Sequence, residues 1–78
     1  MITGDLIRAG RALLGWSSKT LAARANVGTA TVLRIERSRH VARGQAKTLE
    51  KLVAALHEAG VQFVEDDRHG TGVHLRGE

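Results

Sequence analysis

The 78-residue chain has no cysteine, no proline and no tyrosine, and it contains a single tryptophan and a single phenylalanine. Without cysteine, neither a disulfide framework nor a zinc site built on thiolates can stabilise the fold. A chain of this length forms one domain, whose hydrophobic core is close to the lower limit of independent stability. We therefore expect a single domain that is held by packing and gains stability from a partner.

Long apolar segments are also missing. No run approaches the roughly 20 apolar residues that cross a bilayer, and no basic segment followed by an apolar one stands at the N-terminus. We therefore expect a cytoplasmic protein with no membrane contact.

Acidic residues are outnumbered, 8 against 12 lysines and arginines, and the formal net charge of +4 favours a polyanionic partner. The basic side chains gather at 34–43 and the acidic ones at 65–67.

The spacing of apolar residues predicts four helices and then two short strands. The helices are expected over residues 4–14, 18–25, 29–37 and 45–59. The first helix carries an apolar stripe formed by Leu6, Ile7, Leu13 and Leu14, and Gly60 ends the last helix. The hydrophobic period then changes, and the strands are expected at 61–64 and 72–76.

The second and third predicted helices are joined by a tight turn, which is the layout of a helix-turn-helix. Ser17 is placed to cap the second helix. Asn26 stands where the chain must reverse, and asparagine enters the left-handed conformation at modest cost. Ala22 is small enough to let the two helices cross closely. An ordinary pair of helices in a small bundle has the same layout.

The flanking residues favour the helix-turn-helix, because the chain resembles the Xre/Cro-type regulators, the family of phage repressors and many small bacterial regulators. The resemblance covers about residues 7–56 and is carried by Arg11, Leu13, Leu14, Gly15, Trp16, Ser17, Leu21, Ala22, Val27, Val32, Arg34, Ile35 and Glu36. The chain departs from the family pattern at Ser18, where glutamine is frequent, and at Asn26, where glycine is frequent. The resemblance implies a mainly α fold, a four-helix Xre/Cro-type helix-turn-helix domain over 1–60, here followed by a short C-terminal β-hairpin over 61–78.

In a helix-turn-helix, the start of the second motif helix reaches base edges in the major groove of double-stranded DNA. The expected base contacts are Thr29, Ala30, Thr31 and Arg34. The expected contacts to the DNA backbone are Ser17, Ser18, Lys19, Gly28, Arg37, Arg39 and Arg43. Arg34 can bind guanine O6 and N7 with two hydrogen bonds. A phosphate contact is the alternative for Arg34, and helix capping is the alternative for each threonine.

The resemblance also implies a structural pair near the DNA. Arg11 in the first helix is expected to pair with Glu36 at the end of the third, which orients the reading helix. Trp16 is expected to pack at the corner between the first two helices, because readers of duplex DNA seldom stack exposed aromatic side chains on bases.

The residue pattern does not indicate catalysis. Its histidines form no ligand set with metal-binding spacing; they are His40, His57, His69 and His74. Neither Ser17 nor Ser18 has a neighbouring histidine that could act as a base. The segment 70–72 reads Gly-Thr-Gly, but no helix follows it to bind a phosphate. We therefore expect no enzyme, no metal and no cofactor.

The predicted hairpin is too short to be stable alone. It must either pack on the chain's own helices or pair across a homodimer. The second alternative assigns dimerisation to Val61, Phe63, Val64, Val73 and Leu75. On that alternative, deletion of residues 61–78 is expected to give a monomer that binds its DNA weakly.

The predicted function is a sequence-specific transcriptional regulator, a homodimeric repressor that binds a palindromic, inverted-repeat operator. An alternative from another class is a protein-interaction module on the same fold, such as an antitoxin or an antagonist of another regulator. This alternative predicts an exposed apolar surface that binds a regulatory protein partner, on the tail or at Leu33.

Overall fold

The computed structural model describes residues 2–38 and 46–77 of the chain. In these segments the chain forms helices α1 (Gly4–Leu13), α2 (Ser18–Ala25), α3 (Thr29–Arg37) and α4 (Ala46–Glu58), and then the antiparallel strands β1 (Val61–Asp66) and β2 (Gly70–Leu75). The prediction of a mainly α fold with a short C-terminal hairpin is therefore confirmed.

β1 is longer than predicted, and β2 begins at Gly70 and ends at Leu75, earlier at both ends than the predicted 72–76. β1 continues to Asp66, which pairs with Gly70 at the start of β2. The Asp66 carboxylate accepts the backbone N–H groups of Arg68 and His69 at 2.7 and 3.1 Å, and these bonds close the turn. The turn and its flanking residues are exposed throughout. Because this end of the hairpin is held by hydrogen bonds and not by burial, the hydrophobic pattern did not reveal it.

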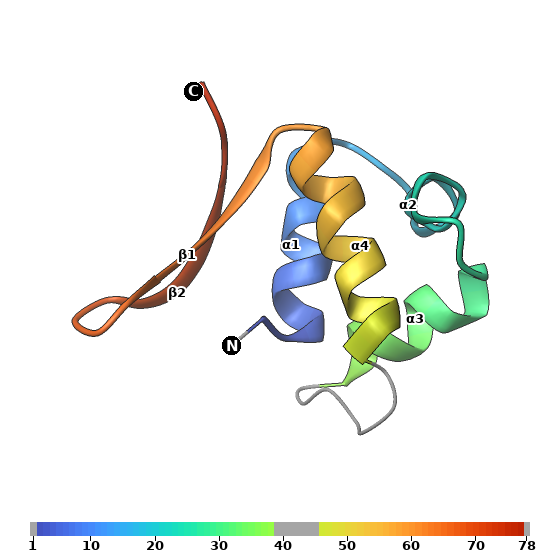
Figure 1. Ribbon diagram of the computed structural model, residues 1–78, viewed down its shortest axis with the longest axis horizontal. Coiled ribbons are helices and arrows are strands. Elements are labelled where there is room, and N and C mark those ends of the chain that lie inside the picture. The colour runs from blue at the N-terminus through green and yellow to red at the C-terminus, as the bar shows by residue number, and fades with distance from the viewer. Residues whose placement is uncertain (1, 39–45, 78) are drawn as a thin grey trace.

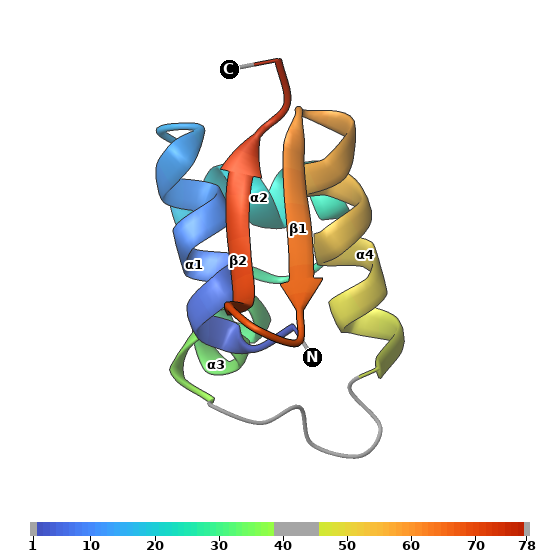
Figure 2. The same ribbon diagram turned by 90° about the vertical axis from the view of Figure 1, so that its left-hand side faces the viewer.

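The described elements form three layers, as Figures 1 and 2 show. The hairpin covers one side of α1 and α4, and α2 and α3 lie on the other side of these two helices. The interior is filled by large apolar side chains with no exposed surface, which come from the four helices and β1: Ile7, Leu21, Val32, Leu52, Leu56 and Val61. The hairpin therefore lies on the side of the molecule away from α2 and α3.

Two glycines let α1 approach its neighbours closely. The Gly4 N–H donates to the Ser38 carbonyl at 3.2 Å. A Cβ at Gly4 would collide with the carbonyl oxygens of Ile35 and Ser38, so the start of α1 lies directly against the end of α3. At Gly10, a Cβ would lie 3.2 Å from a methyl carbon of Val61 in β1. α1 thus fixes the position of both α3 and the hairpin.

We expect Gly4→Ala to lower the free energy of unfolding by about 2 kcal/mol, because the added methyl group must push the backbone of α3 away. Thermal unfolding measures the change. Gly72→Ala is the matched control, since a Cβ there would make only an ordinary 3.6 Å contact with Val64. The control should change stability by less than about 0.5 kcal/mol. Equal melting temperatures for Gly4→Ala and the wild type would contradict the close approach.

The open end of the hairpin is anchored to the end of α4. The Arg76 N–H donates to the Gly60 carbonyl at 2.6 Å, and the Arg76 guanidinium donates to the His57 carbonyl at 3.3 Å. Gly60, at a φ of 108°, turns the chain from α4 into β1. These contacts hold both strands against the helices.

Candidate nucleic-acid interface

The turn between α2 and α3 has the predicted geometry. Asn26 is in the left-handed region, with φ 59° and ψ 46°, and its N–H points to the carbonyls of Ala22 and Ala23. At the other end of α2, the Ser17 hydroxyl oxygen accepts the Thr20 N–H at 3.0 Å. Both the capping role of Ser17 and the reversal at Asn26 are therefore confirmed, and Ala22 is buried as expected.

One face of α3 points away from the protein. Ala30, Leu33, Arg34 and Arg37 are exposed, whereas Val32, Ile35 and Glu36 are buried. The exposed residues are spaced three or four apart, so they share one face of the helix. Figure 1 shows α3 at the edge of the molecule, on the far side of α1 and α4 from the hairpin. We call the surface formed by Ala30, Leu33, Arg34 and Arg37 the outward face of α3. Two of the expected base contacts, Ala30 and Arg34, lie on it.

The first turn of α3 carries the two threonines. Thr29 and Thr31 are half-buried, and the residue before the helix, Gly28, is exposed with an extended backbone. No side chain caps the helix. Neither threonine therefore caps α3, and the capping alternative finds no support.

Three residues that the sequence predicts to contact phosphates lie at the start of α2. Ser17 and Lys19 are exposed and Ser18 is half-buried. The N-terminal N–H groups of a helix and the positive end of its dipole favour an anion. The start of α2 thus combines the cation Lys19 with a helix N-terminus, and α2 directly precedes α3 in the chain.

An ion pair joins α1 to α3, as the resemblance implied. Arg11 donates to the two carboxylate oxygens of Glu36 at 2.8 and 2.9 Å. Glu36 is the buried charged side chain of the described residues, at 4% exposure. The hydrogen bonds that Arg11 donates to Glu36 raise the pKa of Arg11, against the opposite effect of burial. The third guanidinium nitrogen of Arg11, Nη1, donates to the Trp16 carbonyl at 3.1 Å, so one side chain links α1, α3 and the residues just before α2.

Trp16 occupies the predicted corner. Its ring is half-buried and packs against the core. The guanidinium carbon of Arg24 lies 5.1 Å from the ring centroid, within the range of a cation–π contact. The ring therefore has neighbours on the protein, as a structural role requires.

The basic connector after α3 is only partly described. Arg37 is exposed at the end of the helix. The predicted DNA-backbone contacts Arg39 and Arg43, and also His40, lie outside the described residues.

Leu33 is the residue on the outward face of α3 to which the sequence analysis assigned no DNA contact. Its position three residues after Ala30 and directly before Arg34 was the signal that could have placed it there.

The residues predicted to dimerise mostly face the chain's own helices. Val61 is fully buried, and Phe63, Val73 and Leu75 pack against the same core. Val64 is different, because 41% of it is exposed on the outer side of the hairpin. The structure thus shows the hairpin covering α1 and α4, and leaves Val64 as the large apolar side chain of this element that a second copy could reach.

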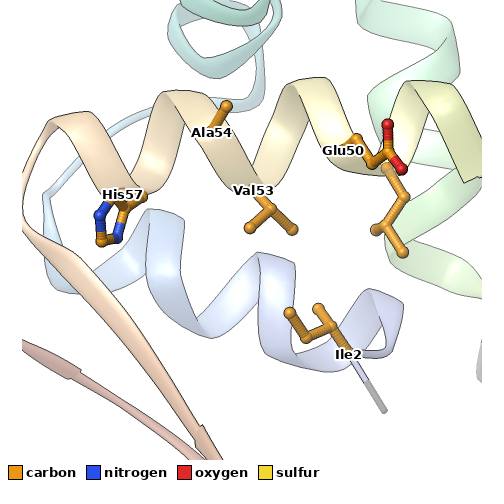
Figure 3. A pocket seen from close by; sticks show the side chains of 6 residues that line it. Ile2, Glu50, Val53, Ala54 and His57 are labelled. Carbon is orange, nitrogen blue, oxygen red and sulfur yellow. The ribbon is translucent and has the colours of Figure 1, made fainter.

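A groove opens between the start of α1 and α4, with a volume of about 460 Å³. Figure 3 shows its lining, which is mainly apolar and consists of Ile2, Leu49, Glu50, Val53, Ala54 and His57. None of these residues belongs to α2 or α3. The groove is therefore a second surface, separate from the outward face of α3.

In residues 2–38 and 46–77, no three potential metal ligands are placed so that they could hold an ion together. Over the same part of the chain, no helix has the length and apolar character needed to cross a membrane. Comparison with known proteins gives no match, either to a family model or to a curated protein.

Proposed function

We propose that the protein is a transcriptional regulator that binds double-stranded DNA sequence-specifically, with α2 and α3 as a helix-turn-helix of the Xre/Cro type. The observation that carries the proposal is the outward face of α3, which presents Arg34 and Arg37 while α3 itself is fixed to α1 by a buried ion pair. An α-helix fits the major groove, and an arginine on its outer face can bind guanine with two hydrogen bonds.

The charges around this face suit the phosphate backbone. Lys19 stands at the N-terminus of α2, and Arg37 at the C-terminal end of α3. In the proposed complex, these cations and the N–H groups of α2 hold the duplex, and the base contacts come from the start and middle of α3. A homodimer on an inverted repeat adds the affinities of two such small modules. The hairpin lies away from α3, so contact between two hairpins leaves the reading face free.

The test is a selection from a pool of random DNA duplexes, followed by binding measurements on the enriched duplex at several salt concentrations. We expect an enriched inverted repeat, and an affinity that falls steeply as salt is added. Arg37→Ala should weaken binding and reduce the salt slope by about one. Arg68→Ala is the matched control, because it removes one exposed cation from the hairpin turn. A pool that yields no enriched sequence would exclude the proposed function.

Arg34→Ala is expected to remove discrimination at one base pair of each half-site. A bidentate arginine contact contributes about 1–3 kcal/mol against the wrong base. Binding to a scrambled duplex should change much less than binding to the selected one. Equal losses on the two duplexes would mean that Arg34 contacts a phosphate, the alternative left open by the sequence.

The apolar groove supports a second candidate function, a protein-interaction module of the antitoxin or antagonist kind. Four of its six lining residues are Ile2, Leu49, Val53 and Ala54, which offer an apolar surface to a partner. On this candidate, Ala54→Asp should abolish capture of the partner while leaving DNA binding unchanged. If Ala54→Asp instead weakens DNA binding as much as Arg37→Ala does, the groove belongs to the DNA-binding assembly.

A further inference from the structure

Leu33 gives the outward face of α3 an apolar centre. It is 38% exposed, and the other large apolar side chains exposed in the described part of the chain, Leu13 and Val64, lie on α1 and β1. A single exposed leucine is common on protein surfaces and proves little by itself. Leu33, however, shares its face with Ala30, three residues earlier, and with the cations Arg34 and Arg37.

A face that carries both apolar side chains and two cations suits a polyanion that has apolar groups between its charges. An apolar protein surface would meet two guanidinium groups beside Leu33. The major groove of DNA offers phosphates to the cations and, on its floor, the C5-methyl group of thymine as a small apolar target. The charge of the face therefore argues for DNA as the occupant at Leu33.

We propose that Leu33 is a specificity-determining residue that contacts the C5-methyl group of a pyrimidine, in the base pair next to the guanine bound by Arg34. This inference rests on the proposed function. Leu33 and Arg34 are consecutive residues of a helix and project about 100° apart, so they reach neighbouring base pairs and not the same one. The ligand chemistry is a methylated pyrimidine, which is thymine in unmodified DNA or 5-methylcytosine in methylated DNA.

The experiment replaces each thymine of the selected duplex with uracil, one position at a time. Uracil lacks only the methyl group, so base pairing is retained. At one position in each half-site we expect the wild-type protein to bind about fourfold more weakly, which corresponds to roughly 0.8 kcal/mol for one buried methyl group. Leu33→Ala should bind the thymine and uracil duplexes equally.

Leu13→Ala is the matched control, since Leu13 is 43% exposed but lies at the end of α1. It should keep the wild-type sensitivity to uracil. Because Leu33 is on the surface, we expect its variant to retain the wild-type melting temperature, and thermal unfolding checks this.

A second arm separates the two sources of the methyl group. Cytosine is placed at the sensitive position, paired with guanine, and the affinities of the unmethylated and C5-methylated duplexes are compared. Methylation should strengthen binding by the wild type about fourfold, as for thymine over uracil, and should leave Leu33→Ala unaffected. A gain with thymine alone would overturn a general methyl contact.

The inference and the proposed function fail in different ways. If an enriched duplex binds tightly but no thymine is sensitive to uracil, or if Leu33→Ala keeps the sensitivity, Leu33 does not read a methyl group and the regulator proposal stands. If selection yields no duplex at all, both are overturned.

Discussion

Glu36→Ala is expected to lower the melting temperature by more than about 10 °C and to abolish binding to the DNA duplex that the proposed selection enriches. The Glu36 carboxylate is buried and accepts two hydrogen bonds from Arg11. Removal of one partner from a buried ion pair costs about 3–5 kcal/mol, because the remaining charge is left uncompensated. The Arg11 side chain is 21% exposed, so we expect the lower end of that range. In a domain of this size, 1 kcal/mol corresponds to about 4–8 °C.

A double-mutant cycle tests the coupling. Arg11→Ala should be at least as destabilising as Glu36→Ala, because it leaves the more deeply buried Glu36 carboxylate without a partner. The double variant should cost far less than the sum of the two. Glu50→Ala, which removes an exposed carboxylate from α4, is the control and should change stability by less than about 0.5 kcal/mol. Additive effects of Arg11→Ala and Glu36→Ala would show that the pair does not hold α3.

Replacing the pair by apolar side chains separates stability from orientation. Such replacements of buried ion pairs are often neutral or stabilising. We expect Arg11→Met with Glu36→Leu to regain the wild-type melting temperature. DNA affinity should stay below that of the wild type, since the variant lacks the fork of hydrogen bonds that sets the angle of α3. Full recovery of affinity would assign the pair to stability alone.

The α2–turn–α3 region was predictable because its signals are local. Ser17 and Asn26 mark the two ends of α2 through their own backbone preferences, and Leu21, Ala22 and Ala25 recur at helical spacing. The contact between Arg11 and Glu36 is not local, and periodicity alone does not predict it. It came from the resemblance to a family.

One position was misjudged and one contact was missed within α1. The sequence placed Leu13 in the apolar stripe of α1, but it is 43% exposed. Leu13 lies six residues after the buried Ile7, which turns its side chain to another face of the helix. The close approach of Gly4 to Ser38 joins the two ends of a 35-residue segment. No residue type or local spacing in that segment indicates the contact, so the sequence did not predict it.

The hairpin shows the same limit. Alternation of apolar and polar residues identified β1, but it could not say whether the inner face meets the chain's own helices or a second copy. Val61 and Val64 are three residues apart and therefore lie on opposite faces of the strand. The structure buries Val61 fully and leaves Val64 41% exposed. What decides between them is which face α1 and α4 cover.

Deletion of residues 61–78 is expected to unfold the protein, and not to give the folded monomer that the sequence suggested. The deletion removes Val61 from the centre of the core and uncovers the side of α1 at Gly10, which Val61 contacts. Phe63→Ala should already cost about 1.5 kcal/mol, because a half-buried ring that packs against the core is lost. Thermal unfolding of both variants measures the loss. A truncated chain that melts at the wild-type temperature would mean that the hairpin contributes nothing to the core.

Dimerisation through the hairpin must therefore be tested on its outer side, at Val64. Val64→Lys places a charge where an apolar contact between two copies would lie, and a charge brought into such an interface without a partner is costly. We expect sedimentation to show a monomer with the wild-type melting temperature at low concentration. Binding to the full inverted repeat should fall far more than binding to a single half-site, because only the repeat needs both copies. If Val64→Lys stays dimeric, the two copies meet elsewhere, and the apolar groove beside α4 is the surface to test next.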